Sequence, residues 1–179
     1  MKYRLTVGIL VCLFISLASA FHSGGASLPP DPWVCKPCGY DCDNSTYDKP
    51  GNCPHCGMPL VRKSKVLFDN ISPTEIGAFI RAHPKVILLD VRTKEEFEGT
   101  ANPNFGTLKN AINIPVQELE SKLSTIQTLK DKDIIAYCSH GHRSAVASYL
   151  LTQHGFHHVI NMTGGMSVMH DSSIMISNR

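Results

Sequence analysis

From residue 66 onward, short apolar runs alternate with stretches in which hydrophobic and polar residues are mixed. The apolar runs are rich in valine, isoleucine and leucine, which is typical of strands in a parallel sheet that is covered on both faces. The mixed stretches between them carry hydrophobic residues at helical spacing. The predicted strands lie at residues 66–68, 86–90, 111–114, 133–137 and 158–160.

Start and stop signals accompany the stretches between the strands. Ser72 and Glu75 form a predicted capping box, with Pro73 at the first helical position. Gly155 stands where the C-terminal cap of the last helix belongs. The predicted helices cover residues 72–81, 93–98, 117–124 and 144–154.

This alternation predicts an α/β fold over residues 66–170, followed by a C-terminal tail over 171–179. We expect a five-stranded, mainly parallel sheet with helices on both faces. In such sheets, ligands bind at the carboxyl ends of the strands.

The N-terminal residues have the pattern of a signal peptide over 1–20. Lys2 and Arg4 precede an apolar run over 5–17, and Ala18-Ser19-Ala20 resembles a cleavage site. We therefore expect export to the periplasm or the medium, with a mature chain that begins at Phe21. A transmembrane anchor is the competing interpretation, but the apolar run is short for spanning a bilayer.

Residues 21–32 contain glycine, serine and proline and are interpreted as a flexible tether. Loss of the leader removes two of the seventeen basic side chains, leaving fifteen against fifteen acidic ones. A balanced charge gives no electrostatic argument for nucleic acid as a partner. We likewise expect no membrane partner once the leader is removed.

Five cysteines fall between residues 35 and 56, and their spacing indicates a metal site. Two Cys-x-x-Cys pairs, Cys35 with Cys38 and Cys53 with Cys56, are separated by fourteen residues. This is the spacing of a small zinc ribbon, in which four thiolates bind one structural zinc ion. A module over residues 33–62 is too small to bury a sufficient core, so a metal or crosslinks must hold it.

Two alternatives accompany this metal prediction. The cysteines of an exported protein can instead form disulfides. Cys42 and His55 are further donors, which are interpreted as bystanders.

Residues 48–61 resemble the short heavy-metal-binding module that is attached to metal efflux proteins. In that module, the first cysteine pair commonly ends in histidine, where this chain has Cys38. The substitution favours a four-thiolate site and leaves the choice of metal open.

A sixth cysteine, Cys138, stands alone between a predicted strand and a predicted helix, in the run Cys138-Ser139-His140-Gly141-His142-Arg143. A loop that enters a helix turns backbone N–H groups toward one centre, and the helix start adds a positive dipole end. Such a loop binds anions and favours the thiolate form of a cysteine. Cys138 is therefore a candidate nucleophile. Gly141 permits a positive φ, and Arg143 adds charge or ties down the loop.

The loop resembles the active-site loop of the rhodanese family, Cys-x-x-Gly-x-Arg followed by a small hydroxyl residue, here Ser144. Further matching segments occur in the expected order at residues 89–92, 95–97, 110–115 and 161–165.

The resemblance implies sulfur transfer without a cofactor for that step. Cys138 would take the outer sulfur of a donor such as thiosulfate, hold it as a persulfide and pass it to cyanide or a thiol. The resemblance implies catalytic roles for Cys138 and Arg143. It implies substrate-binding roles for Ser139, His140, Gly141, His142 and Ser144.

Other classes of function remain open at this point. Cysteine phosphatases and arsenate reductases share the loop architecture but place one more residue between cysteine and arginine, whereas four intervene here. A non-enzymatic metal-binding or persulfide-carrying protein is the other alternative. Asp90 and Arg92 are interpreted as a strand-end cap that pairs with Glu95 or Glu96, and Ser144 as a hydrogen-bonding residue at the helix start.

Overall fold

A computed structural model of the chain describes residues 30–176, and the residues from Asp31 onward form one compact unit. The predicted leader and most of the predicted tether lie outside the described residues. Within them, no helix combines the length and the apolar character needed to cross a bilayer.

The centre of the fold is a five-stranded sheet in the order β4-β9-β8-β5-β7, and every neighbouring pair is parallel. Leu89 of β5 lies opposite Ala136 of β8 on one side and opposite Ile112 of β7 on the other. The apolar runs seen in the sequence therefore lie side by side in the middle of the sheet. The strands are β4 (Asp69–Ile71), β5 (Ile87–Asp90), β7 (Ile112–Asn113), β8 (Asp133–Tyr137) and β9 (His158–Met162).

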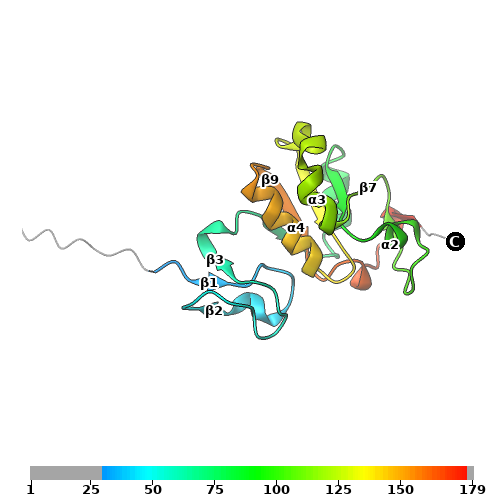
Figure 1. The fold of residues 1–179 in the computed structure, drawn as a ribbon. Coiled ribbons are helices and arrows are strands. Elements are labelled where there is room, and N and C mark those ends of the chain that lie inside the picture. Colours follow the sequence, from blue (N-terminus) through cyan, green and yellow to red (C-terminus); the bar gives the residue numbers. More distant parts are fainter. Residues whose placement is uncertain (1–29, 177–179) are drawn as a thin grey trace, which may run out of the picture. The chain divides into compact units, whose positions relative to one another are not determined.

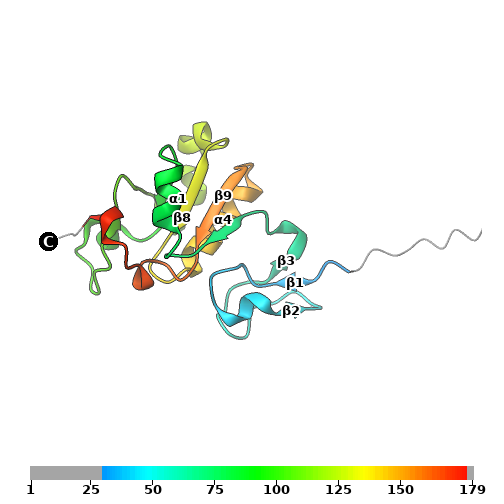
Figure 2. The ribbon, with the colours of Figure 1, turned by 180° about the vertical axis from the view of Figure 1, so that it is seen from behind.

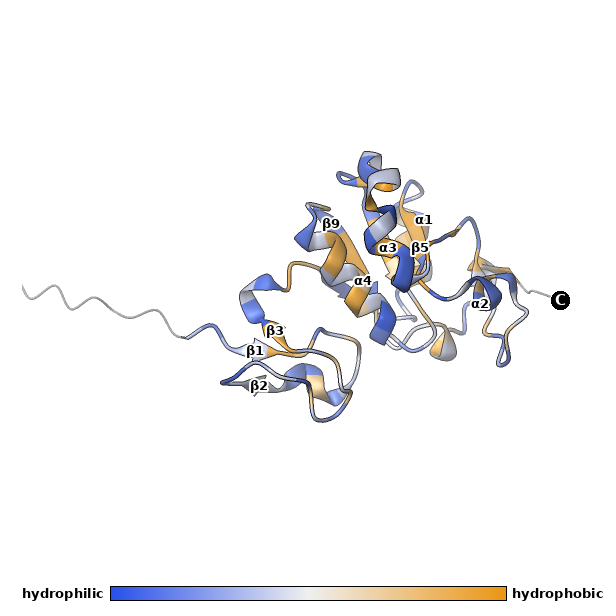
Figure 3. Cartoon of the chain, in the orientation of Figure 1, coloured by the Kyte–Doolittle hydropathy of each residue, from blue (hydrophilic) through white to orange (hydrophobic). Residues whose placement is uncertain are grey.

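Helices cover both faces of this sheet, as predicted (Figure 1, Figure 2). Leu119 and Leu151 pack on one face, and Ile76 packs on the other. The hydrophobic colour in Figure 3 gathers on the central strands and on parts of α4, whereas α2 is hydrophilic. The helices are α1 (Ile76–Ala82), α2 (Lys94–Glu98), α3 (Val116–Lys122), which a 3₁₀ helix η3 (Leu123–Leu129) extends, and α4 (His142–Gln153).

The N-terminal module is a small antiparallel sheet in the order β2-β1-β3. Its buried residues are four cysteines and five others: Cys35, Cys38, Cys42 and Cys53, with Val34, Lys36, Met58, Leu60 and Val61. A module with so few apolar side chains relies on its cysteine chemistry for stability. Its elements are β1 (Trp33–Val34), η1 (Asp41–Asn44), β2 (Thr46–Tyr47), β3 (Val61–Arg62) and η2 (Lys63–Lys65).

Two elements begin at least three residues later than the sequence predicts. The first strand of the central sheet lies at 69–71 rather than 66–68, because its register follows its partner β9, with Asp69 opposite Ile160. The strand is at the sheet edge and is largely polar, so no apolar run marks it. The next helix begins at Ile76, because Ser72 and Glu75 hydrogen-bond to each other in a turn that precedes it.

The segment that the sequence analysis set apart as a tail packs against the α/β domain as far as residue 176. A 3₁₀ helix η5 (Ser172–Ile174) leads into β10 (Met175–Ile176), which pairs antiparallel with β6 (Thr107–Leu108). A further 3₁₀ helix, η4 (Met166–Val168), precedes them.

Candidate functional site

Cys138 follows β8 at the carboxyl end of the central sheet and is 1% exposed. Its Sγ accepts a hydrogen bond from the backbone N–H of Gly141 at 3.1 Å. The Oγ of Ser144 lies 3.5 Å from the same sulfur and donates to the carbonyl oxygen of Gly141 at 3.0 Å. Met166 donates its backbone N–H to the carbonyl oxygen of Cys138 at 2.8 Å. Cys138 is therefore held by the loop that follows it and by the segment that follows β9.

Gly141 is the residue on which the loop conformation depends. Its φ is +90°, in the left-handed region that disfavours side chains. It is also the N-cap of α4, so the loop enters a twelve-residue helix directly behind its N–H donors. This arrangement supplies the fixed backbone donors that the sequence predicted for an anion or a thiolate.

Arg143 is engaged by Glu96, whose carboxylate it contacts at 2.6 and 2.7 Å through two nitrogens. Ser139 donates its Oγ to the same carboxylate at 2.6 Å. The Arg143 guanidinium lowers the pKa of Glu96 to about 2. Arg143 therefore ties the loop to α2.

The sequence interpretation missed this role of Glu96. We expected Arg92 to pair with Glu95 or Glu96, but Arg92 contacts Asp90 at 2.6 Å, with both side chains buried. A visible signal existed, because Thr93 and Glu96 form a capping box that fixes the start of α2. It places the Glu96 carboxylate within reach of the loop.

The two loop histidines have different surroundings. His140 is exposed and meets the Phe105 ring edge-on, with centroids 5.5 Å apart. His142 stacks on Tyr40 of the N-terminal module, with ring centroids 4.6 Å apart. Burial lowers the pKa of His142, which favours a neutral ring. All seven loop residues singled out from the sequence thus lie together at one end of the sheet.

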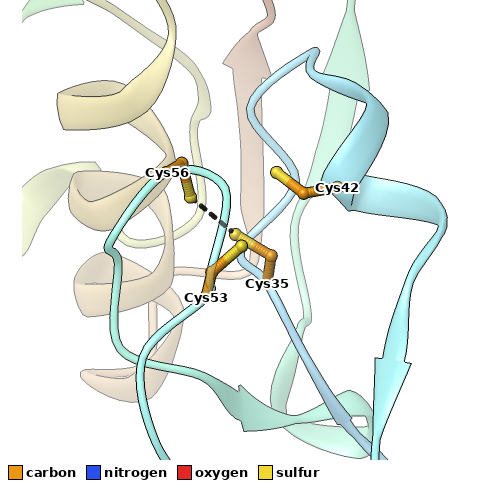
Figure 4. Close-up of side chains that lie close together, drawn as sticks. All are labelled: Cys35, Cys42, Cys53 and Cys56. Carbon is orange, nitrogen blue, oxygen red and sulfur yellow. Dashed lines mark hydrogen bonds between the residues drawn. The ribbon is translucent and has the colours of Figure 1, made fainter.

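The cysteine cluster has a different membership from the predicted set. The structure brings together the sulfurs of Cys35, Cys42, Cys53 and Cys56, all within 4.8 Å of one another (Figure 4). Cys42, interpreted as a bystander, takes the place predicted for Cys38.

The reason lies in Asp43, toward which Cys38 is turned. One carboxylate oxygen of Asp43 accepts the backbone N–H of Cys38 at 2.9 Å, and the other lies 3.6 Å from its Sγ. Cys38, Cys42 and Asp43 form a second close group of donors, so Cys38 remains near the cluster without joining it.

The four-sulfur group fits a tetrahedral metal ion. Bonds of about 2.3 Å place tetrahedral sulfurs about 3.8 Å apart, and Sγ of Cys35 and Cys56 are 3.3 Å apart here. Burial opposes ionisation of Cys53, but the backbone N–H groups of Cys56 and His55 lower its pKa to about 6. Burial raises the pKa of Cys42 to about 11. The lowered pKa of Cys53 favours its thiolate, which is the form of cysteine that binds a metal ion.

A cavity of about 430 Å³ opens between the cysteine cluster and the loop of Cys138. Cys42 and Cys56 line it from the cluster, and His142 lines it from the loop. Tyr40, Asp41 and His55 complete its wall.

Comparison with protein families matches residues 72–171, more than half of the chain, to the rhodanese-like domain. Residues 33–63 match the heavy metal binding domain. Among solved structures, a rhodanese-related protein from Thermoplasma volcanium is similar, with 28% identity and a TM-score of 0.51. The similarity covers 63% of this chain and 100% of that one.

Curated relatives include proteins named tRNA uridine(34) hydroxylase. The one from Hamiltonella defensa is 28% identical over 110 residues, 55% of this chain and 29% of the relative. The one from Buchnera aphidicola is 30% identical over 123 residues, 59% of this chain and 37% of the relative. The chain therefore spans about a third of the length of these relatives.

Proposed function

The chain belongs to the rhodanese-like domain family, and from this premise we propose that it is a sulfurtransferase that carries sulfane sulfur on Cys138. The donor would be a small molecule such as thiosulfate, and the acceptor cyanide or a thiol. The observation that carries the proposal is the contact between the Cys138 sulfur and the Gly141 N–H at 3.1 Å, inside the loop that caps α4.

The chemistry follows from that contact. The Cys138 thiolate attacks the outer sulfur of thiosulfate, a sulfur–sulfur bond forms, and sulfite leaves with the electron pair of the broken bond. The resulting persulfide is then attacked at its terminal sulfur by the acceptor, which becomes thiocyanate or a new persulfide and returns the Cys138 thiolate. Backbone N–H donors and the positive end of α4 stabilise the negative charge throughout.

The surroundings of Arg143 favour this reaction over phosphate or arsenate chemistry. An arginine that clamps a tetrahedral oxyanion directs its nitrogens at the anion. Here the Arg143 nitrogens contact Glu96 and Ser139 instead. Arg143 therefore acts as a positioning residue for the loop, in place of the catalytic role implied by the family resemblance.

The N-terminal module is proposed to hold one structural metal ion, with zinc as the first candidate. Its four sulfur ligands would be Cys35, Cys42, Cys53 and Cys56. The ion would supply the crosslink that the small apolar core lacks.

Export remains part of the proposal and rests on the leader pattern at residues 1–20. Neither nucleic acid nor a membrane is included as a partner. The tRNA chemistry named for the relatives is left with them, because the chain spans only about a third of their length.

The test is incubation of the reduced protein with thiosulfate, followed by intact mass and then by addition of cyanide. We expect a gain of one sulfur atom, its loss on addition of cyanide, and repeated release of thiocyanate. The Cys138→Ser variant should show none of these, and sulfate, which has no transferable sulfur, should give no adduct.

Three other results would contradict or change this proposal. Absence of an adduct on the folded, reduced chain would rule out sulfur transfer from thiosulfate. Hydrolysis of a phosphate ester that depends on Cys138 would point to the phosphatase alternative. A persulfide that forms once and is not passed on repeatedly would make the protein a carrier rather than an enzyme.

A further inference from the structure

Residues 37–43 of the N-terminal module, which we call the bridging turn, lie directly against the segments around the nucleophile. Asn161, at the end of the central strand β9, donates its Nδ2 to the carbonyl oxygen of Pro37 at 2.9 Å. Gly164 donates its backbone N–H to the carbonyl oxygen of Cys38 at 3.1 Å. The module is thus hydrogen-bonded to the loop that follows β9.

The closest approach is at Gly141, the residue that donates to the nucleophile. A Cβ on Gly141 would overlap the carbonyl oxygen of Cys38. A Cβ on Gly39 would lie 2.9 Å from the Cβ of Thr163, so the contact is close on the module side as well. The bridging turn therefore touches the residue whose N–H holds the sulfur of Cys138.

An aromatic stack adds a second contact between the bridging turn and the loop. The rings of Tyr40 and His142 are 4.6 Å apart with an interplanar angle of 22°. Tyr40 is 45% exposed, so it is not buried in the core of its own module. Its ring instead covers one side of a loop residue.

At its other end, the bridging turn belongs to the thiol cluster. The Sγ of Cys42 is one of the four sulfurs that lie within 4.8 Å of one another. The adjacent Asp43 accepts the backbone N–H groups of Cys38 and Gly39 at 2.9 and 2.7 Å. A continuous path therefore leads from the cluster through Cys42, Asp43 and Cys38 to Gly141.

We propose that the bridging turn is a positioning element of the sulfur-transfer site, and that a metal ion on the cysteine cluster sets its position through Cys42. Asp43 transmits the position of Cys42 to Cys38, and Cys38 fixes the backbone of Gly141. The inference rests on the proposed metal site and goes beyond the proposed function, because it makes the reactivity of Cys138 dependent on metal occupancy.

Thermodynamic linkage indicates how large such a coupling is and requires that it act in both directions. Coupling between two sites commonly changes an equilibrium affinity about 5- to 150-fold. It also acts equally in both directions, so persulfide formation on Cys138 must change metal affinity by the factor with which the metal changes persulfide stability.

The experiment compares the rate of Cys138 alkylation by iodoacetamide in the full chain loaded with Zn²⁺ and in the chain depleted by a chelator. Digestion and mass analysis follow the peptide that contains Cys138 separately from the cluster peptides. This readout does not require persulfide formation, so the inference is tested even if thiosulfate proves not to be a donor. A difference between the two rates beyond the scatter of repeated measurements is the expected result.

Three variants locate the path, and a fourth serves as the matched control. Asp43→Ala should retain one Zn²⁺ per chain but lose the dependence of the alkylation rate on Zn²⁺. Tyr40→Ala, a change at an exposed side chain, should weaken that dependence, and Tyr40→Phe should restore it because the ring stack remains. Asp48→Ala lies in the same module at an exposed position and should behave as the unaltered chain.

The outcomes are distinct. Equal alkylation rates with and without Zn²⁺, in a chain shown to bind it, would overturn the inference and leave the proposed sulfur transfer intact. A Zn²⁺ dependence that Asp43→Ala, Tyr40→Ala and Asp48→Ala all preserve would also overturn it, because the coupling would not pass through the bridging turn. Loss of the dependence in Asp43→Ala and a weaker dependence in Tyr40→Ala, with Asp48→Ala unchanged, would support it.

Discussion

The molecule uses cysteine in two regions, and the surroundings give the two regions different chemistry. Cys138 is a single thiol at the end of a central strand, with a backbone N–H donor 3.1 Å from its sulfur. In the N-terminal module, four thiols lie within 4.8 Å of one another and share little backbone support apart from that at Cys53. The first arrangement gives one sulfur a backbone donor, whereas the second gathers four sulfurs in the number that a tetrahedral metal ion binds.

The comparison shows that the two sites are held in place by different elements of the structure. The loop of Cys138 is held by the central sheet, by α4 and by the Arg143–Glu96 pair, none of which includes a cluster cysteine. The cysteine cluster is held by short strands and 3₁₀ turns around a small apolar core. We therefore expect metal removal to affect the two regions unequally.

The largest expected effect is a difference in Zn²⁺ affinity between the Cys42→Ser and Cys38→Ser variants. Cys42→Ser removes one of the four gathered sulfurs and should weaken Zn²⁺ binding by more than about 100-fold, beyond the range seen for partners that only support a ligand. Cys38→Ser should weaken it by about tenfold at most. Competition with a chromophoric chelator measures both. A larger loss in Cys38→Ser than in Cys42→Ser would restore the set predicted from the sequence.

The second-largest expected effect is that metal removal exposes the backbone amides of the N-terminal module and leaves those of the central sheet protected. In hydrogen exchange, a chelator should raise the exchange of residues 33–62 strongly, because their core is too small to stand alone. The amides of β5 and β8 should remain protected. Uniform loss of protection across both regions would contradict the separation of their supports.

Glu96→Gln tests the support of the catalytic loop. It removes the charged partner of Arg143, a partly buried contact at 2.6 Å. Loss of a hydrogen bond to a charged group costs about 1.5–3 kcal/mol, so kcat/KM for sulfur transfer should fall about 10- to 100-fold. Zn²⁺ affinity, which depends on the other region, should change far less. Steady-state kinetics and chelator competition on the same preparation give both values.

The smallest expected effect is a pH dependence of the stability that the Glu96–Arg143 pair contributes to the fold. The pKa of Glu96 falls from 4.5 to about 2 on folding. A carboxyl group whose pKa is lowered by folding stabilises the fold above its unfolded pKa and loses that contribution as the pH falls through its folded pKa. The difference in unfolding free energy between the unaltered chain and Glu96→Gln should be constant from pH 7 to about 5 and shrink between about 4.5 and 2. Denaturant titrations at several pH values measure it.

The sequence predicted the α/β class, the faces covered by helices and the place of Cys138, because buried apolar runs and a strand-to-helix loop are visible locally. It did not predict the pairing of Arg143 with Glu96, which lies 47 residues away in the chain. It also missed Cys42, because spacing rules weigh Cys-x-x-Cys pairs and cannot show that Asp43 turns Cys38 aside. Edge strand β4 escaped detection because it carries polar residues.

Native mass spectrometry of the Zn²⁺-loaded chain before and after thiosulfate tests the central claim, that one protein keeps two separate thiol chemistries. The account predicts one bound metal ion throughout and a gain of one sulfur atom after thiosulfate, located on Cys138 by digestion. Sulfur found on the cluster cysteines instead of Cys138 would contradict it.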